Sequence, residues 1–238
     1  MFHDLPLAER LVLARRGTSF FAQQLGELSD DELAGPTLLD GWTRKHVIAH
    51  VAYNAAALCR LLDWAASGTE IPMYASVQQR NDEISAGATL SAGALRNLFD
   101  HTVARLDEKW RHLADSAWDA EVVTVQGRIV PAAETAWMRA REVWIHAVDL
   151  AGTGRFTDLP AVVLTSVLSD IVKAWRTNEL GSQLVLDVSG TPPIAIKPGH
   201  TAASVVRGNL ASIVRWSAGR GAVGVTSPEA SPVPPRWL

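Results

Sequence analysis

The chain has 238 residues, of which 47% are hydrophobic and 20% are charged, a balance typical of a globular protein with an ample core. Its net charge of -3 provides no basic surface for nucleic acid or an anionic membrane, so we expect neither as a partner. The single cysteine excludes an internal disulfide and a cysteine-rich zinc site, and it fits the reducing cytoplasm that we expect for this protein.

The first 152 residues contain four long segments in which apolar residues recur with helical spacing. We predict helices over residues 5–28, 43–66, 91–114 and 131–152. Thr43 is a suitable N-cap for the second helix, Pro131 suits the first turn of the fourth, and Gly152 suits its C-cap. The N-terminal stretch lacks the apolar core of a signal peptide, and no apolar run is long enough to span a membrane.

Two segments between these helices lack a helical pattern. Residues 67–89 are polar and carry Gly68, Pro72 and Gly87, which predicts a long loop. Residues 121–131, EVVTVQGRIVP, predict a small hairpin or loop. Four helices with one long crossover indicate a four-helix bundle, an architecture in which facing helices often build metal sites.

The pattern changes after Gly154. We predict two further helices, three short strands and an extended proline-rich tail. The helices cover residues 160–180 and 210–218, and the strands cover 184–188, 194–196 and 203–207. The expected fold class is therefore α+β, with a metal-binding four-helix bundle over residues 1–154 and a small α/β domain over residues 155–238.

Three polar residues fall on the inward faces of two predicted helices. Glu142 and His146 are four residues apart, which places them one above the other, and His50 can reach them from the facing helix. Two imidazoles and one carboxylate leave positions open on a metal ion, as a catalytic site requires. The alternative is a plain hydrogen-bonded cluster between helices, and spacing alone favours that alternative.

Neighbouring residues leave further alternatives. His46 lies one turn before His50 and is a rival ligand, although it is nearer the start of the helix. Asp149 can accept a hydrogen bond from the His146 imidazole, but its place at the end of the helix favours a solvent-facing side chain. Cys59 points about half a turn away from His50 and is expected to be a small buried apolar residue.

Two arginines can bind an anionic ligand. Arg220 lies between two glycines, which allow close approach of backbone and ligand, and its guanidinium can bind a carboxylate through two hydrogen bonds. Taken alone, a surface loop arginine is the favoured interpretation, and Arg80 in the predicted loop has a weaker case. The chain lacks a dinucleotide fingerprint, a phosphate loop and a nucleophile elbow, so an enzyme of this sequence would depend on a metal.

Four long strings carry a resemblance that runs nearly end to end. They are FHDLPLAERLVLAR, GWTRKHVIAHVAYNA, RIVPAAETAWMRAREVWIHAVDL and GNLASIVRWSAGRGAVGVTS, the last followed by a PPRWL end. With these strings the chain resembles the mycothiol-dependent maleylpyruvate isomerases of the DinB-like helical bundle group. The resemblance implies an N-terminal DinB-like four-helix bundle and a small C-terminal α/β domain.

The same resemblance implies a site and a reaction. The implied zinc ligands are His50, Glu142 and His146, and the implied catalytic arginine is Arg220. The implied reaction is the cis–trans isomerisation of maleylpyruvate to fumarylpyruvate in gentisate degradation. Mycothiol would be the thiol cosubstrate and would be regenerated, so the expected partners are a small-molecule substrate and this thiol.

Three alternatives stay open at this point. A mycothiol S-transferase acting on electrophiles would use the same bundle and the same three residues. A non-catalytic bundle would pair the buried histidines with the carboxylate alone. Iron or manganese suits two histidines and a carboxylate as well as zinc does. Because no long apolar stripe is left exposed, we expect a monomer.

Overall fold

The computed structural model describes residues 1–199, 204–227 and 233–237, which form two compact units. One unit comprises His3–Thr153, and the other comprises Gly154–Leu238 together with Met1–Phe2. The predicted α+β class, with a helical bundle and a small mixed region, is confirmed. No helix in the described ranges combines the length and the apolar character needed to cross a lipid bilayer.

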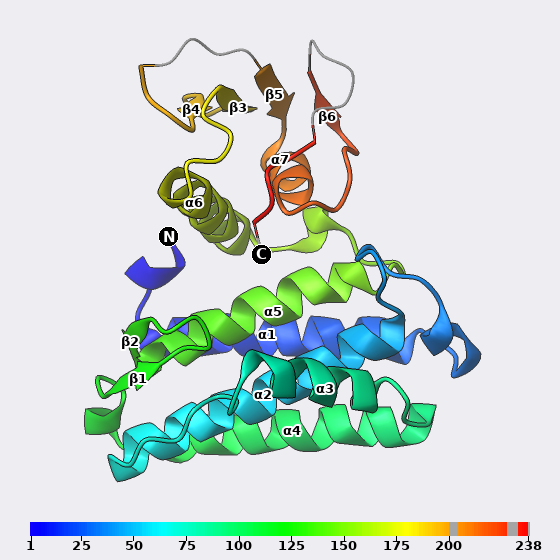
Figure 1. The fold of residues 1–238 in the computed structure, drawn as a ribbon, viewed down its shortest axis with the longest axis vertical. Helices are drawn as coiled ribbons and strands as arrows, with labels where there is room; N and C mark the ends of the chain where they lie inside the picture. The colour runs from blue at the N-terminus through cyan, green and yellow to red at the C-terminus, as the bar shows by residue number, and fades with distance from the viewer. Residues whose placement is uncertain (200–203, 228–232, 238) are drawn as a thin grey trace. The chain divides into compact units, whose positions relative to one another are not determined.

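The bundle is built from two pairs of long helices. Its helices are α1 (Leu7–Gly26), α2 (Arg44–Ser67), α3 (Val77–Gly87), α4 (Ala92–His112) and α5 (Thr135–Asp149). In Figure 1, α1 lies beside α5, α2 lies beside α4, and the short α3 packs on α2. Helix α2 also contacts α5, and this contact brings the two predicted site segments together.

Shorter elements complete this unit. The 3-10 helices are η1 (Phe2–Asp4), whose first residue belongs to the other unit, η2 (Asp31–Ala34), η3 (Asp115–Ala117) and η4 (Ala132–Glu134). Strands β1 (Glu121–Val123) and β2 (Ile129–Pro131) pair antiparallel, with Val122 opposite Val130, as the hairpin alternative predicts. The hairpin leads through η4 directly into α5.

The helix boundaries show which local signals were correct. Thr43 is confirmed as the N-cap of α2, where it forms a capping box with His46. The predictions of Pro131 in the first turn and Gly152 as the C-cap of the fourth helix are wrong, because Pro131 ends strand β2 and precedes η4, and the C-cap of α5 is Leu150. The predicted loop over residues 67–89 is also wrong in part, because it contains α3.

Helix α3 lacked a sequence signal because it buries very little. Only Ile84 and Gly87 of its residues are buried, so no apolar stripe marks it. The Ser76 hydroxyl accepts a hydrogen bond from the Gln79 amide at 3.0 Å and so caps its first turn.

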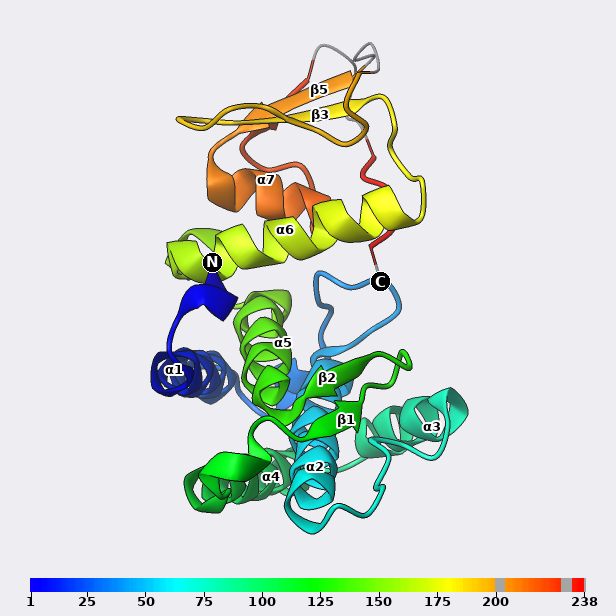
Figure 2. The ribbon, with the colours of Figure 1, turned by 90° about the vertical axis from the view of Figure 1, so that its left-hand side faces the viewer.

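The second unit is a small sheet with helices on one face. It contains η5 (Phe156–Asp158), α6 (Ala161–Thr177), β3 (Leu184–Val188), β4 (Ile194–Ala195), β5 (Ser204–Gly208), α7 (Leu210–Ser217) and β6 (Val225–Thr226). The strand order is β4-β3-β5-β6, with β3 and β5 parallel and the other pairs antiparallel. Figure 2 shows α7 between the sheet and α6.

The sequence missed strand β6, a two-residue element. Residue 203 of the third predicted strand lies outside the described residues, as do residues 228–232 and 238 of the tail predicted to be extended.

Candidate metal centre

His50, Glu142 and His146 lie together between α2 and α5. One potential ligand atom from each residue lies within 4.8 Å of the others. The Glu142 Oε2 is 2.7 Å from His50 Nε2 and 3.2 Å from His146 Nε2, and the two imidazole rings are perpendicular at 4.9 Å. The four-residue spacing on α5 and the contact of α2 with α5 thus bring two nitrogens and one oxygen to one place.

Burial and hydrogen bonding set the charges of these three groups. Burial alone would raise the pKa of Glu142, but its hydrogen bonds with His146 and His50 hold the pKa well below its usual value. Burial lowers the pKa of His50, and the bond with Glu142 offsets this only in part. Around His146 burial is outweighed by hydrogen bonds with Asp149 and Glu142, which raise its pKa. Glu142 is therefore an anion and His50 is neutral.

Asp149 is part of this centre. Its side chain is fully buried, and Oδ2 lies 2.8 Å from Nδ1 of His146. The favoured prediction of a solvent-facing Asp149 is therefore wrong, and the alternative of a bond to the imidazole is correct. An acceptor at Nδ1 keeps a hydrogen on that nitrogen, so Nε2, which faces Glu142, is the nitrogen that can bind a metal after it loses its proton.

Arg80 lies at the opposite side of the His50 ring. It belongs to α3, and its Nη2 is 3.3 Å from His50 Nδ1, while Nη1 bonds to Asn81 Oδ1 at 3.2 Å. Trp42 packs edge-on against the same imidazole, with ring centroids 5.5 Å apart. The sequence predicts a loop at residue 80 and a weak case for Arg80, whereas a helix presents this side chain to the centre.

The rival ligand His46 has a different role. Its Nδ1 accepts hydrogen bonds from the Thr43 hydroxyl at 2.8 Å and from the Thr43 amide at 3.3 Å, so it caps α2. It is absent from the ligand cluster found among the described residues.

Cys59 is buried, as expected, and burial raises the pKa of its thiol to about 11.

Arg220 lies in the other compact unit, in the turn that follows α7. Gly219 and Gly221 beside it have φ angles of 78° and 88°, a backbone conformation that favours glycine. The guanidinium donates a hydrogen bond to the Ala218 carbonyl, and the Arg220 carbonyl accepts one from Arg215 Nε at 2.7 Å. Its catalytic role stays a prediction.

The described cluster fits a metal ion with open positions. It offers two imidazole nitrogens and one carboxylate oxygen, the donor set of many catalytic zinc sites, and Asp149 orients one imidazole.

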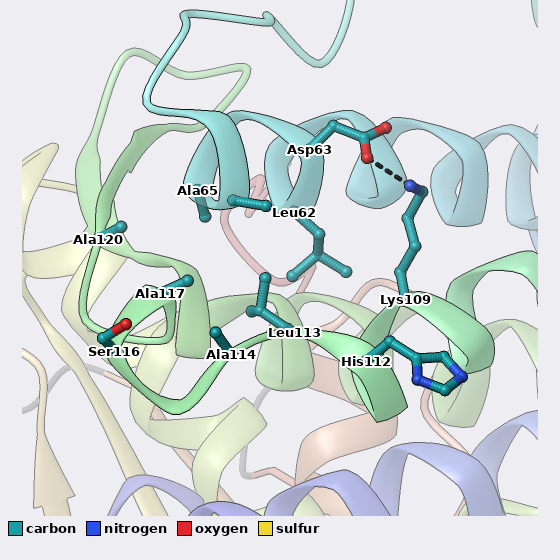
Figure 3. A pocket seen from close by; sticks show the side chains of 11 residues that line it. Leu62, Asp63, Ala65, Lys109, His112, Leu113, Ala114, Ser116, Ala117 and Ala120 are labelled. Carbon is teal, nitrogen blue, oxygen red and sulfur yellow. Dashed lines mark hydrogen bonds and ion pairs between the residues drawn. The ribbon is translucent and has the colours of Figure 1, made fainter.

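A separate pocket of about 430 Å³ lies between the later turns of α2 and α4, where Asp63 and Lys109 pair (Figure 3). None of the three cluster residues lines that pocket.

Comparison with known proteins gives a consistent result. The family model of the mycothiol maleylpyruvate isomerase N-terminal domain matches residues 14–151. A crystal structure of the mycothiol-dependent maleylpyruvate isomerase is 52% identical, with a TM-score of 0.96, over 100% of this chain and 99% of that chain. A variant of that isomerase with one histidine replaced by alanine gives the same values. No curated protein matches the sequence.

Proposed function

The chain belongs to the mycothiol maleylpyruvate isomerase family, and we propose that it converts maleylpyruvate to fumarylpyruvate with mycothiol as cosubstrate. The observation that carries the proposal is the buried cluster of His50, Glu142 and His146 within a chain that matches the isomerase end to end. Zinc is the proposed metal, gentisate degradation the proposed pathway and the cytoplasm the proposed location.

The reaction needs a nucleophile that the chain does not itself supply. A carbon–carbon double bond does not rotate at a useful rate, but reversible addition of a thiolate turns it into a single bond that does. Expulsion of the thiolate then restores the double bond in the trans form. Cys59 is a poor source of that thiolate because burial raises its pKa to about 11. A thiol cosubstrate fits this chemistry.

The three ligands and Asp149 set the electrostatics of the site. When bound, zinc would lower the pKa of a coordinated thiol or polarise a substrate oxygen. Glu142 contributes one negative charge, and Asp149 holds the His146 ring so that Nε2 faces the cluster. The ligand side chains are only 7 to 14% exposed, which limits competition from water for the same positions.

Ionisation of the thiol is too small an effect to account for catalysis. A thiol of pKa about 8.5 is a few per cent ionised at neutral pH, so complete ionisation increases the thiolate by roughly thirtyfold. Part of this gain is lost because a thiolate of lower pKa is a weaker nucleophile. Orientation of the substrate must contribute more, and we assign that role to Arg220, whose guanidinium would hold a carboxylate or the developing enolate.

The test is an assay of maleylpyruvate loss by the purified protein, with and without mycothiol, together with the metal content by mass spectrometry. We expect thiol-dependent formation of fumarylpyruvate, about one zinc per chain and no net loss of thiol. Consumption of mycothiol in proportion to product would instead identify an S-transferase. A protein with neither metal nor activity would contradict the proposal.

A further inference from the structure

The contact between Arg80 and His50 fixes which nitrogen of the imidazole carries the hydrogen. An arginine side chain has only donors, so the Nδ1 of His50 accepts from Arg80 Nη2 across the 3.3 Å contact. The Nε2 therefore carries the hydrogen of the neutral ring and donates it to Glu142 Oε2 at 2.7 Å.

The two histidines of the cluster therefore differ in whether the imidazole must change its tautomer before Nε2 can bind a metal. His146 has its Nδ1 against the Asp149 carboxylate, which keeps a hydrogen on that nitrogen, so its Nε2 can bind a metal once the proton it shares with Glu142 is lost, without a change of tautomer. His50 can bind a metal through Nε2 only after its hydrogen moves to Nδ1. An N–H at Nδ1 would then face the N–H group of Arg80, and two donors cannot share that contact.

We propose that Arg80 and the metal ion are alternative partners of His50, and that metal binding releases the guanidinium to hold a carboxylate of the substrate. The second half rests on the proposed function, because maleylpyruvate is a dianion. The released group remains beside the centre, since α3 packs on α2, the helix that carries His50. Arg80 is thus a positioning residue for the substrate.

The surroundings of Arg80 suit this role. The residue is only half-buried, and its hydrogen bonds go to His50 and to its own neighbour Asn81. It forms no ion pair with a carboxylate in the described part of the chain, so its charge is available to an anion. Helix α3 buries only Ile84 and Gly87, which leaves the side chain of Arg80 room to change rotamer without disturbing the core.

Zinc affinity tests the first half without any need for turnover. Competition with a chromophoric chelator would compare the wild type, Arg80→Ala and the control Arg105→Ala, which removes an equal charge from a half-exposed position on α4. Loss of one competing hydrogen bond should make Arg80→Ala bind zinc roughly two- to tenfold more tightly, with Arg105→Ala unchanged. Equal or weaker zinc binding by Arg80→Ala would overturn the proposal.

The tautomer of His50 gives an independent readout on the unaltered protein. Long-range ¹⁵N–¹H correlation spectra of the imidazole should show the hydrogen of His50 on Nε2 in metal-free protein and on Nδ1 after zinc is added. A hydrogen on Nδ1 of His50 in the metal-free protein would overturn the competition, whatever the behaviour of the variants.

Calorimetric titration with maleate, an unreactive dicarboxylate, tests the second half on zinc-loaded protein. We expect Arg80→Ala to bind maleate roughly ten- to a hundredfold more weakly than the wild type, as loss of a charged hydrogen-bond partner predicts. Equal maleate binding, or none by the wild type, would overturn the anion-binding role. If Arg80→Ala binds zinc more tightly and maleate more weakly, but the wild type does not isomerise maleylpyruvate, the proposed function fails and this inference stands.

Discussion

Asp149 Oδ2 lies 2.8 Å from Nδ1 of His146, and its side chain has no exposed surface. A buried carboxylate is costly unless it is bonded to a cation or to hydrogen-bond donors, and His146 provides such a donor. The same bond fixes the ring so that Nε2 faces Glu142. This pair therefore links the end of α5 to the orientation of a proposed metal ligand.

Replacement of Asp149 by Asn should weaken zinc binding roughly ten- to a hundredfold, because the neutral amide supports the imidazole less well. Zinc affinity by chelator competition measures the effect, and circular dichroism shows whether the variant is folded. Asp107→Asn is the matched control, since Asp107 pairs with Arg15 on the surface of the same unit. Equal zinc affinities for the two variants would refute a supporting role for Asp149.

Replacement of His50 or Glu142 by Ala should abolish zinc and isomerase activity together, because three ligands are the minimum for a firm catalytic site. His46→Ala should retain a full zinc content, since His46 caps α2 through Thr43. Metal analysis of the three purified variants gives the answer. If His50→Ala kept its zinc and His46→Ala lost it, the ligand assignment would have to be exchanged.

The sequence predicted the centre where local geometry determined it. The spacing of Glu142 and His146 and the apolar stripe around His50 were sufficient to bring these residues together on facing helices. The burial of Asp149 could not be predicted, because it depends on a segment distant in sequence. The amide of Leu38 donates to the Asp149 carbonyl at 3.1 Å, and Arg44 Nε donates to the Leu150 carbonyl at 2.7 Å. Neither contact has a periodic signal.

Arg80 escaped detection for a different reason. A short, mostly exposed helix packs through few apolar residues, so its sequence resembles that of a polar loop. A predicted loop gives the side chain of residue 80 no defined direction, so the sequence does not indicate its contact with His50. Hydrophobic periodicity does not predict the tertiary contacts of an exposed polar helix.

Zinc affinity should fall as the pH falls, with the dependence expected when one proton competes with the metal ion. The pKa of His146 is raised above its usual value of 6.5, so its proton competes with zinc even near neutral pH. The pKa values of His50 and Glu142 are lowered, so neither adds a proton in that range. Below the pKa of His146 the affinity should decrease about tenfold per pH unit. Chelator competition between pH 5 and 9 measures this dependence. A decrease of about a hundredfold per pH unit, which indicates two competing protons, would contradict the assignment.

In the metal-free protein, the contribution of His146 to the free energy of unfolding should decrease as the pH rises, whereas zinc affinity increases. Because the folded-state pKa of His146 is raised, its protonated form stabilises the fold fully below its unfolded pKa, and this contribution is lost as the pH rises through the folded pKa. The difference in unfolding free energy between the wild type and Asp149→Asn should therefore shrink with rising pH. Urea unfolding of zinc-free protein at several pH values tests this, and a constant difference would argue against it.

Replacement of Arg220 by Ala should lower kcat/KM for maleylpyruvate roughly ten- to a hundredfold while the zinc content stays unchanged, because one charged hydrogen-bond donor to the substrate is lost. Arg207→Ala is the control, since Arg207 lies in the same unit and pairs with Asp187 at 3.1 Å. Steady-state kinetics with saturating mycothiol measures both. Unchanged kinetics for Arg220→Ala would remove this residue from the proposed function.

Gly17 allows α1 to approach the helix that carries Glu142 and His146. A Cβ at this position would lie 2.6 Å from Trp144 Nε1 and 2.7 Å from a methyl group of Val143, so Gly17→Ala requires these α5 side chains or the helices themselves to shift. The free energy of unfolding should fall by about 1–3 kcal/mol, the usual cost of overpacking.

Gly26→Ala provides the matched control in the same helix, because a Cβ there meets no atom within 4 Å. Alanine favours the helix over glycine by up to about 1 kcal/mol, so this variant should be unaffected or slightly more stable. Urea unfolding of the zinc-free proteins compares the two substitutions directly. If they changed stability equally, close contact at Gly17 would not be what holds α5 in place. If only Gly17→Ala lost stability and zinc affinity together, the packing of α1 on α5 would be shown to position the ligands.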